Sequence, residues 1–279
     1  MTFFAAVHKA LIATIPSDKV VLTQALYKTV EAGCLDLSDR QRVVAPERPG
    51  LPTGLTLVHP NQLKRRSPHT EKGRAVLIHA IAHIEFNAIN LALDAVLRFS
   101  HMPDAYLRDW LSVAAVEADH FQLVQGRLQA YGYDYGDFPA HNGLWDVASR
   151  SADDVLERMA VVPRVLEARG LDVTPAMRDN LEAAGDSEMA AILDIIYRDE
   201  IGHVAVGTQW FRWLCEKRDL DPMQSFQQII QRYYSGSLRG PFNHEARLKA
   251  GFDKVEMDML AALNSKLTLS VSKQPYRRL

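Results

Sequence analysis

The sequence predicts an all-α protein: a four-helix bundle with extra helices at both ends and a proline-rich arm near the N-terminus. Three observations support this prediction. Apolar residues recur at intervals of three and four over four long segments, as on one face of a helix. Glycines and prolines, which interrupt regular structure, lie mainly between those segments. The pattern Glu-x-x-His occurs in two of the long segments, and each copy follows a lone glutamate by 32 or 33 residues.

The composition is that of an ordinary globular chain. Of the 279 residues, 47% are hydrophobic and 24% are charged, and the formal net charge is -2 at pH 7. This balance gives no global reason to expect nucleic acid or an anionic membrane as a partner. Cys34 and Cys215 form neither a metal-spaced pair nor a disulfide framework, so we expect a reducing, cytoplasmic location. We also expect no signal peptide and no membrane span, because no long uncharged apolar segment is present.

Residues 1–69 are expected to hold one or two helices followed by the arm. Helical spacing covers residues 3–32, with Ser17 and Asp18 as N-cap residues and Gly33 as the stop. The following segment cannot be a long helix or a central strand, because it contains Pro46, Pro49, Pro52, Pro60 and Pro68. We interpret it as an arm that wraps the bundle, and the alternatives are that it covers a site or binds a partner.

Residues 70–219 are expected to form the bundle itself. Its long helices are predicted at about residues 70–99, 104–131, 154–169 and 187–217. A crossover rich in glycine, tyrosine and proline connects the second helix to the third. Pro163 should kink the third helix, Gly170 should end it, and a short helix should follow from Thr174 to Gly185. Residues 220–279 are expected to add a helical extension, with helices at about 221–234 and 246–265.

The two Glu-x-x-His motifs and their preceding glutamates are the candidate site. Residues three apart on a helix are separated by about 60° and one turn, so both side chains can reach one point. Antiparallel helices bring residues of such separation to one level, which would place the two halves together in the bundle. The candidate metal ligands are Glu85, Glu117, His120, Glu167, Glu200 and His203. The alternative is a buried network of glutamates and histidines that only holds the bundle together.

Four carboxylates and two imidazoles in a helical core are typical of di-iron and di-manganese carboxylate proteins. Two Fe(II) ions would neutralise the four carboxylates, and hard oxygen ligands with two nitrogens suit iron or manganese. We therefore predict two Fe ions, and Fe/Mn or Mn/Mn pairs are compatible with the same ligands.

Several neighbouring residues have weaker claims to the site. Asp199 is a candidate second-shell acceptor for a ligand histidine, with a surface ion pair as the alternative. Tyr197, one turn before Glu200, is a candidate second-shell or redox tyrosine, with core packing as the alternative. His79 and His83 are expected to be core or interface histidines. Glu157 is a rival to Glu167, although its distance of 43 residues from Glu200 matches the spacing less well.

Four stretches of the chain resemble a known family. They are Ala82-His83-Ile84-Glu85, residues 159–172, residues 198–203 and residues 239–243. They are similar to an uncharacterised bacterial family of ferritin-like proteins, domain-of-unknown-function family 455, and the resemblance covers about residues 5–262. It implies the ferritin-like four-helix bundle and a metal site. That family is also distantly similar to a di-iron hydroxylase that modifies isopentenyl-adenosine in tRNA. In the oxygen-activating branch of the ferritin-like superfamily, which the two Glu-x-x-His halves resemble, oxygenases often carry an acid directly before each Glu-x-x-His. Here Val116 precedes Glu117.

The leading functional hypothesis is a di-iron oxidoreductase that uses O₂ to hydroxylate or oxidise a small organic substrate. No flavin or nicotinamide fingerprint is visible, so an external electron donor is expected. The second hypothesis is a metal-dependent binding or sensing protein without turnover. A third, hydroxylation of a tRNA base, rests on Lys64-Arg65-Arg66 and on the distant resemblance, and its alternative is a solvated basic turn. A homodimer is compatible with all three.

Overall fold

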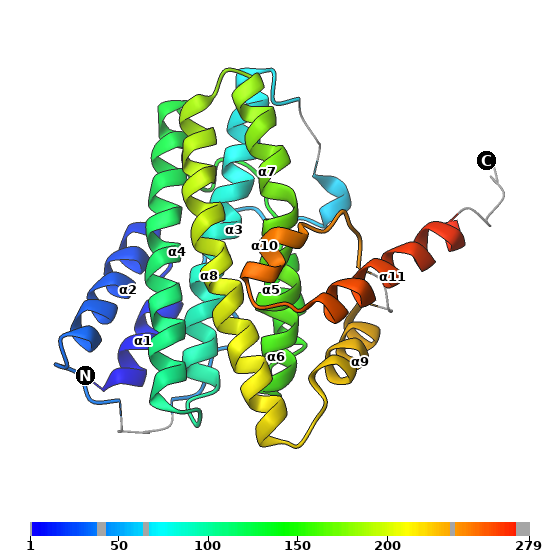
Figure 1. Cartoon of the computed structure of the whole chain (residues 1–279). Coiled ribbons are helices and arrows are strands. Elements are labelled where there is room, and N and C mark those ends of the chain that lie inside the picture. Colours follow the sequence, from blue (N-terminus) through cyan, green and yellow to red (C-terminus); the bar gives the residue numbers. More distant parts are fainter. Residues whose placement is uncertain (1, 38–42, 64–66, 235–237, 272–279) are drawn as a thin grey trace. The chain divides into compact units, whose positions relative to one another are not determined.

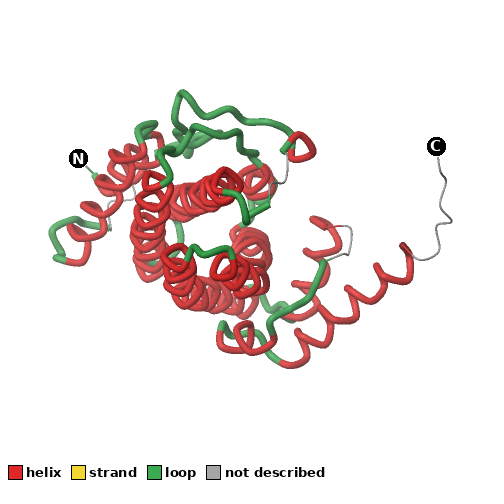
Figure 2. The backbone as a smooth tube through the Cα atoms, turned by 90° about the horizontal axis from the view of Figure 1, so that it is seen from above, coloured by secondary structure: helices red, strands yellow, loops and turns green. Residues whose placement is uncertain are grey.

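The structure, a computed structural model, describes residues 2–37, 43–63, 67–234 and 238–271, with side chains described as far as Leu263. Within these ranges all regular elements are helical, and only an isolated bridge pairs Leu57 with Ala140. Figure 2 shows the same composition, with helices and loops and no strand in the described part of the chain. The predicted all-α class is therefore confirmed.

The chain forms two compact units. Unit 1 comprises Met1–Ala152 and Ala176–Ile196, and unit 2 comprises Asp153–Pro175 and Tyr197–Leu279. Two helices, α7 (Ala168–Ala183) and α8 (Ser187–Lys217), each contribute residues to both units. The sequence predicted a different kind of division, into the consecutive segments 1–69, 70–219 and 220–279. That division stays a prediction.

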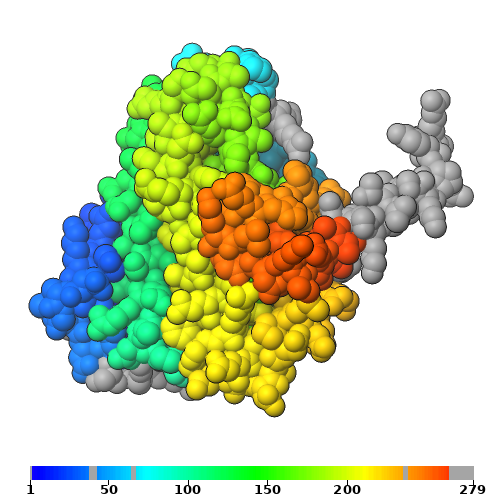
Figure 3. Space-filling model, in the orientation of Figure 1, coloured from blue at the N-terminus to red at the C-terminus, as the bar shows by residue number. Residues whose placement is uncertain are grey.

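Unit 1 is built around two long antiparallel helices, α3 (Glu71–Arg98) and α4 (Asp104–Ala130), which run side by side in Figure 1. The side chain of Thr70 caps α3 by accepting a hydrogen bond from the Gly73 backbone N–H at 3.1 Å. Helices α1 (Phe3–Ile12) and α2 (Pro16–Glu31) pack against this pair, and Figure 3 shows them in blue beside the green α4. A short helix, α5 (Gly143–Ser149), packs on α3.

Helix α3 is the centre of unit 1. It is the one helix in the described ranges that is long and apolar enough to cross a membrane, and 78% of its 18-residue window is buried. The core helix of a soluble protein passes the same test. We therefore interpret α3 as a core helix, consistent with its contacts to α1, α4 and α5.

The described part of the arm belongs to unit 1 and contacts its helices, and its wrapping of a four-helix bundle stays a prediction. The Gly50 backbone N–H donates to the carbonyl of Leu11 at 2.9 Å, and a Cβ on Gly50 would lie 2.2 Å from the carbonyl oxygen of Ile12. No larger residue fits there without displacement of the backbone. The Trp145 indole N–H donates to the carbonyl of Glu47 at 3.0 Å, which ties the arm to α5 as well.

Unit 2 contains a helix with an irregular middle. The helix α6 (Val155–Val161) continues into a π-helix, Val162–Glu167, and then into α7. The sequence predicted a kink at Pro163, and the structure has a π-helix that begins one residue before it. Proline has no N–H to donate to the carbonyl four residues earlier, so the α-helical hydrogen-bond pattern is interrupted at Pro163. In the π-helix the hydrogen bonds span five residues instead of four.

Two predictions for this region were wrong. Gly170 does not end the third helix, and Pro175 does not begin a new one, because α7 runs through both. Pro175 cannot donate to the carbonyl of Leu171, four residues earlier, but the Asn243 side-chain amide donates to that carbonyl at 3.2 Å instead. A side chain 72 residues further along the chain therefore satisfies the Leu171 carbonyl that Pro175 leaves open.

The C-terminal extension also differs from the prediction. After α9 (Pro222–Tyr234), the expected single helix at 246–265 is two helices, α10 (His244–Lys249) and α11 (Lys254–Val271). Gly251 separates them with a φ of +88°, which favours glycine. Asp253 and Glu256 then exchange backbone-to-carboxylate hydrogen bonds of 2.8 and 3.0 Å, a capping box that starts α11.

Close packing of Pro163 on α8 gives a first testable prediction. A Cβ on Gly207 would lie 2.2 Å from Cβ and Cγ of Pro163, whereas a Cβ on Gly202 meets nothing within 4 Å. Gly207→Ala should therefore destabilise the protein by about 1–3 kcal/mol. Gly202→Ala, in the same helix, should be neutral or stabilising by up to about 1 kcal/mol. Urea unfolding of the two variants checks this, and equal stabilities would contradict the close contact.

Candidate metal centre

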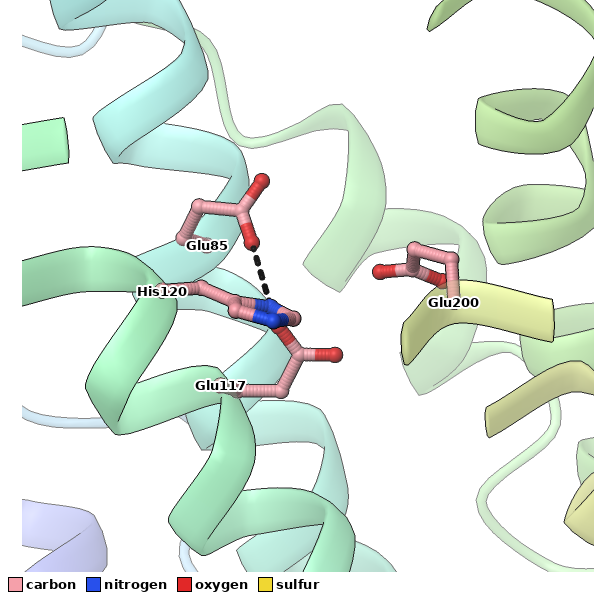
Figure 4. Close-up of side chains that lie close together, drawn as sticks. All are labelled: Glu85, Glu117, His120 and Glu200. Carbon is pink, nitrogen blue, oxygen red and sulfur yellow. Dashed lines mark hydrogen bonds and ion pairs between the residues drawn. The ribbon is translucent and has the colours of Figure 1, made fainter. Parts of the chain in front are cut away.

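Three of the six predicted ligands converge in unit 1. Glu85 comes from α3, and Glu117 and His120 come from one turn of α4, at the level where the two antiparallel helices face each other. Each residue offers one ligand atom, and these atoms lie within 4.8 Å of one another. The Nδ1 atom of His120 is 3.3 Å from Oε2 of Glu117 and 3.5 Å from Oε2 of Glu85. Figure 4 shows the three side chains turned toward one another, with the contact between Glu85 and His120 dashed.

All three side chains are buried, with exposed fractions between 0 and 4%. Burial alone would lower the pKa of His120, but its hydrogen bonds to Glu117 and Glu85 outweigh burial and raise the pKa to about 11. In this arrangement an imidazolium proton holds two buried carboxylates together. A divalent cation bound to the same three groups would supply that positive charge and leave the imidazole neutral.

Unit 2 carries the second Glu-x-x-His motif on α8. The Nδ1 atom of His203 lies 3.8 Å from Oε1 of Glu200, and both residues are buried. Figure 4 draws Glu200 on its helix. The motif therefore has the expected local arrangement, with both side chains on one helix face and one turn apart.

Glu167 is the last residue of the π-helix and is half-buried. The packing of Pro163 on Gly207 fixes how this helix runs along α8. Since Glu167 is four residues after Pro163 and His203 is four residues before Gly207, antiparallel helices bring both to about the same level. Within the described ranges, Glu167 and His203 are not part of a group of three or more converging ligand atoms. Their role as ligands stays a prediction.

The two proposed supporting residues have identified contacts in unit 2. The hydroxyl of Tyr197 accepts a hydrogen bond from the Asn243 side-chain amide at 2.8 Å. Asp199 lies beside Arg198, whose Nε donates to Oδ1 at 3.0 Å, and Arg198 is largely exposed. This is the surface ion pair considered as the alternative for Asp199. The bond from a ligand histidine to Asp199 stays a prediction.

Glu157, the rival to Glu167, is engaged elsewhere. Its carboxylate pairs with Arg232 and accepts a hydrogen bond from the hydroxyl of Tyr233 at 2.5 Å, both on α9. The basic cluster Lys64-Arg65-Arg66, on which the tRNA hypothesis rests, lies outside the described residues.

Sequence reasoning missed the buried arginines of unit 2, which are Arg158, Arg164 and Arg247. Arg164, in the π-helix, is fully buried, pairs with Glu256 and lies 4.1–4.6 Å from three phenylalanine rings, those of Phe211, Phe226 and Phe252. Arg247 pairs with Asp172 at 2.7 Å. A signal was present, because Arg164 interrupts the apolar run Val161–Val165, where an unpaired charge would be costly.

His79 and His83 are buried, as predicted for core histidines, and burial is the main cause that lowers the pKa of each to about 4. In the unfolded chain a histidine has a pKa near 6.5, so the unfolded state binds more protons between pH 6.5 and 4. The stability that depends on neutral histidines should therefore be present above pH 6.5 and fall below it, by about 1.4 kcal/mol per pH unit for each histidine.

Urea unfolding between pH 7 and 4.5 tests this, with His79→Gln as the comparison. Glutamine cannot be charged, and its carbonyl can accept the Gly136 N–H that His79 accepts at 3.0 Å. On acidification the free energy of unfolding of the variant should fall less steeply than that of the wild-type protein. The difference should be at most about 1.4 kcal/mol per pH unit, the effect of one histidine. Equal pH slopes would show that His79 is already charged in the folded protein.

Comparisons with known proteins bear on the whole chain. The model of a family described as "Protein of unknown function (DUF455)" matches residues 13–258, a range that includes all six predicted ligands. An "Uncharacterized protein" from Haemophilus influenzae is 42% identical over 281 aligned positions, which cover 97% of this chain and 98% of that protein. No solved structure matches. The family match and the 42% identity together show that the chain belongs to the DUF455 family.

Proposed function

We propose that this chain is a ferritin-like protein with a dinuclear metal centre, preferably of two iron ions, and that it uses O₂ to oxidise or hydroxylate a small organic substrate. The observation that carries the proposal is the convergence of Glu85, Glu117 and His120 inside unit 1. Two carboxylates and an imidazole, all buried and within 4.8 Å of one another, are a hard ligand set suited to Fe or Mn.

The proposal assigns Glu167, Glu200 and His203 to the second half of the centre. Its support is the sequence spacing, because Glu200 follows Glu167 by 33 residues and Glu117 follows Glu85 by 32. The same Glu-x-x-His arrangement appears on α4 and on α8. Four carboxylates would then balance the charge of two divalent ions in a buried site.

In this account the residues around the centre have separate tasks. Glu85, Glu117 and His120 would bind metal, and His120 would bind as the neutral imidazole after loss of its proton. Phe86 and Phe121 follow Glu85 and His120 directly in the sequence, and their rings pack edge-to-face at 5.2 Å. This apolar layer would keep water away from the ligands. When bound, the metal ions would supply the redox chemistry, and electrons would come from an external donor.

O₂ consumption by the metal-loaded protein tests the activity. Protein loaded anaerobically with Fe(II) and then given O₂ and a reductant should consume O₂ faster than protein loaded with Zn(II), which has no redox chemistry. A centre that binds iron but gives no excess O₂ uptake would leave a metal-dependent binding or sensing protein and would contradict the proposed oxidase. Binding of tRNA that weakens with salt would favour the tRNA-modifying alternative.

A further inference from the structure

A second line of buried polar groups runs along α3, on the face away from Glu85. We call it the polar seam, and its members are His79, His83, Asn87, Asn90 and Asp94. Successive members are three or four residues apart, so they share one face of the helix. Glu85 is two residues from both His83 and Asn87, about 200° around the helix from each. The seam is therefore distinct from the candidate metal centre.

The seam is deeply buried, because each of its five residues is at most 4% exposed. Loops cover part of it. The crossover provides the Tyr135 hydroxyl, 2.8 Å from Nδ1 of His83, and the His141 carbonyl, 2.9 Å from Nε2. The Asn87 amide nitrogen lies 3.1 Å from the same Nε2 atom, so three polar groups surround the His83 ring.

The residues toward both ends of the seam have hydrogen-bond partners, whereas atoms in its middle have none among the described residues. At one end His83 is bonded as above, and the Asn87 amide donates to the His83 carbonyl at 2.8 Å. At the other end Asp94 pairs with Arg98 at 2.8 Å, and Arg98 donates to the Pro46 carbonyl of the arm. Between them, both amide atoms of Asn90 and Oδ1 of Asn87 have no hydrogen-bond partner among the described residues.

Burial of a primary amide without hydrogen bonds is unfavourable, and proteins usually satisfy such groups with internal water. We propose that the middle of the polar seam is a binding site for ordered water, held by Asn90 and by Oδ1 of Asn87. Asn90 offers a donor and an acceptor side by side, and Asn87 adds an acceptor one turn away. The site does not require the metal centre.

The position of this water gives it a structural consequence. Water at Asn90 and Asn87 continues the hydrogen bonds from the Arg98–Asp94 pair toward the His83–Tyr135 pair. Arg98 is partly exposed, whereas the ring of Tyr135 packs on Phe86 and Phe121 at 5.0 and 5.3 Å. The seam would then be one hydrated chain between the surface at Arg98 and the aromatic layer beside Glu85 and His120.

The test uses Asn90→Leu, because leucine has nearly the shape of asparagine but no hydrogen-bonding atoms. A high-resolution crystal structure of the wild-type protein should contain water at about 3 Å from the Asn90 amide, with a contact to Asn87. In solution, ¹⁷O magnetic relaxation dispersion should report at least one long-lived water fewer in Asn90→Leu than in wild type. Asn142→Leu, at a half-buried asparagine bonded to Asp146, is the control and should lose none.

Three results would overturn the proposal. The first is a dry wild-type seam in the crystal, with Asn90 bonded to a protein group. The second is an Asn90→Leu variant with higher thermal stability and unchanged relaxation dispersion, because that outcome means an unsatisfied amide was removed. The third is an organic ligand in the density at Asn90 in place of water. If Asn90→Leu does not fold, the wild-type crystal structure decides alone.

Discussion

Glu117→Gln is expected to lower the affinity for the first metal ion by more than about 100-fold, the largest effect that the structure predicts. Loss of a group that only supports a ligand already costs about 10–100-fold. Glu117 is fully buried, and its carboxylate is 3.3 Å from His120 in the same cluster as Glu85. Glutamine keeps the length and shape of the side chain but has no charge to offer to a cation. Titration of the metal-free protein with Fe(II) or Mn(II) by calorimetry measures the affinity.

The control for this variant is Glu216→Gln, which makes the same chemical change at an exposed position on α8. It should bind metal like the wild-type protein. Circular dichroism and thermal unfolding of metal-free Glu117→Gln should establish that α3 and α4 remain folded. Wild-type affinity in a folded Glu117→Gln protein would remove Glu117 from the ligand set.

Metal binding is expected to release about one proton and to tighten about tenfold for each unit of pH between 6 and 9. The two carboxylates raise the pKa of His120 to about 11, so the metal-free protein carries this proton throughout that range. The metal requires the neutral imidazole and must displace the proton. Calorimetry in buffers of different ionisation enthalpy counts the protons released. A pH-independent affinity would show that His120 is not a ligand or is neutral before metal binds.

The same proton makes the metal-free and metal-loaded proteins respond differently to pH. In the metal-free protein the folded-state pKa of His120 lies above its unfolded value near 6.5. Its contribution to stability is therefore complete below pH 6.5 and is lost as the pH rises toward 11. In the loaded protein this loss should disappear, because the metal holds the two carboxylates together instead. The His120→Gln variant should not lose this stability as the pH rises, whether it is metal-free or metal-loaded.

The long helices were the most predictable part of the fold. The first two bundle helices were expected at 70–99 and 104–131, and α3 and α4 span 71–98 and 104–130. The reason is that their signals are local: long apolar periodicity, and Thr70 as an N-cap residue. The path of α7 was not predictable in this way. Whether Pro175 breaks the helix depends on Asn243, which reaches the open carbonyl of Leu171 from another part of the chain.

The candidate site was predictable to a similar degree. The spacing of 32 residues between Glu85 and Glu117 correctly indicated that the two side chains would meet between α3 and α4. The polar seam was not anticipated as a unit, although its spacing is visible in the sequence. The partner of His83 is Tyr135, in the crossover, and no periodic pattern places a loop residue on a helix face.

The metal content of the purified protein tests the central claim most directly. Protein from cells supplemented with iron and manganese should contain about two metal ions per chain by elemental analysis. Glu200→Ala protein, purified in parallel, should contain fewer. Chelation should lower the melting temperature of the wild-type protein, because a bound metal stabilises the folded state. Protein that carries no metal, and whose melting temperature is the same with chelator and with added Fe(II), would show that these residues form only a structural polar network.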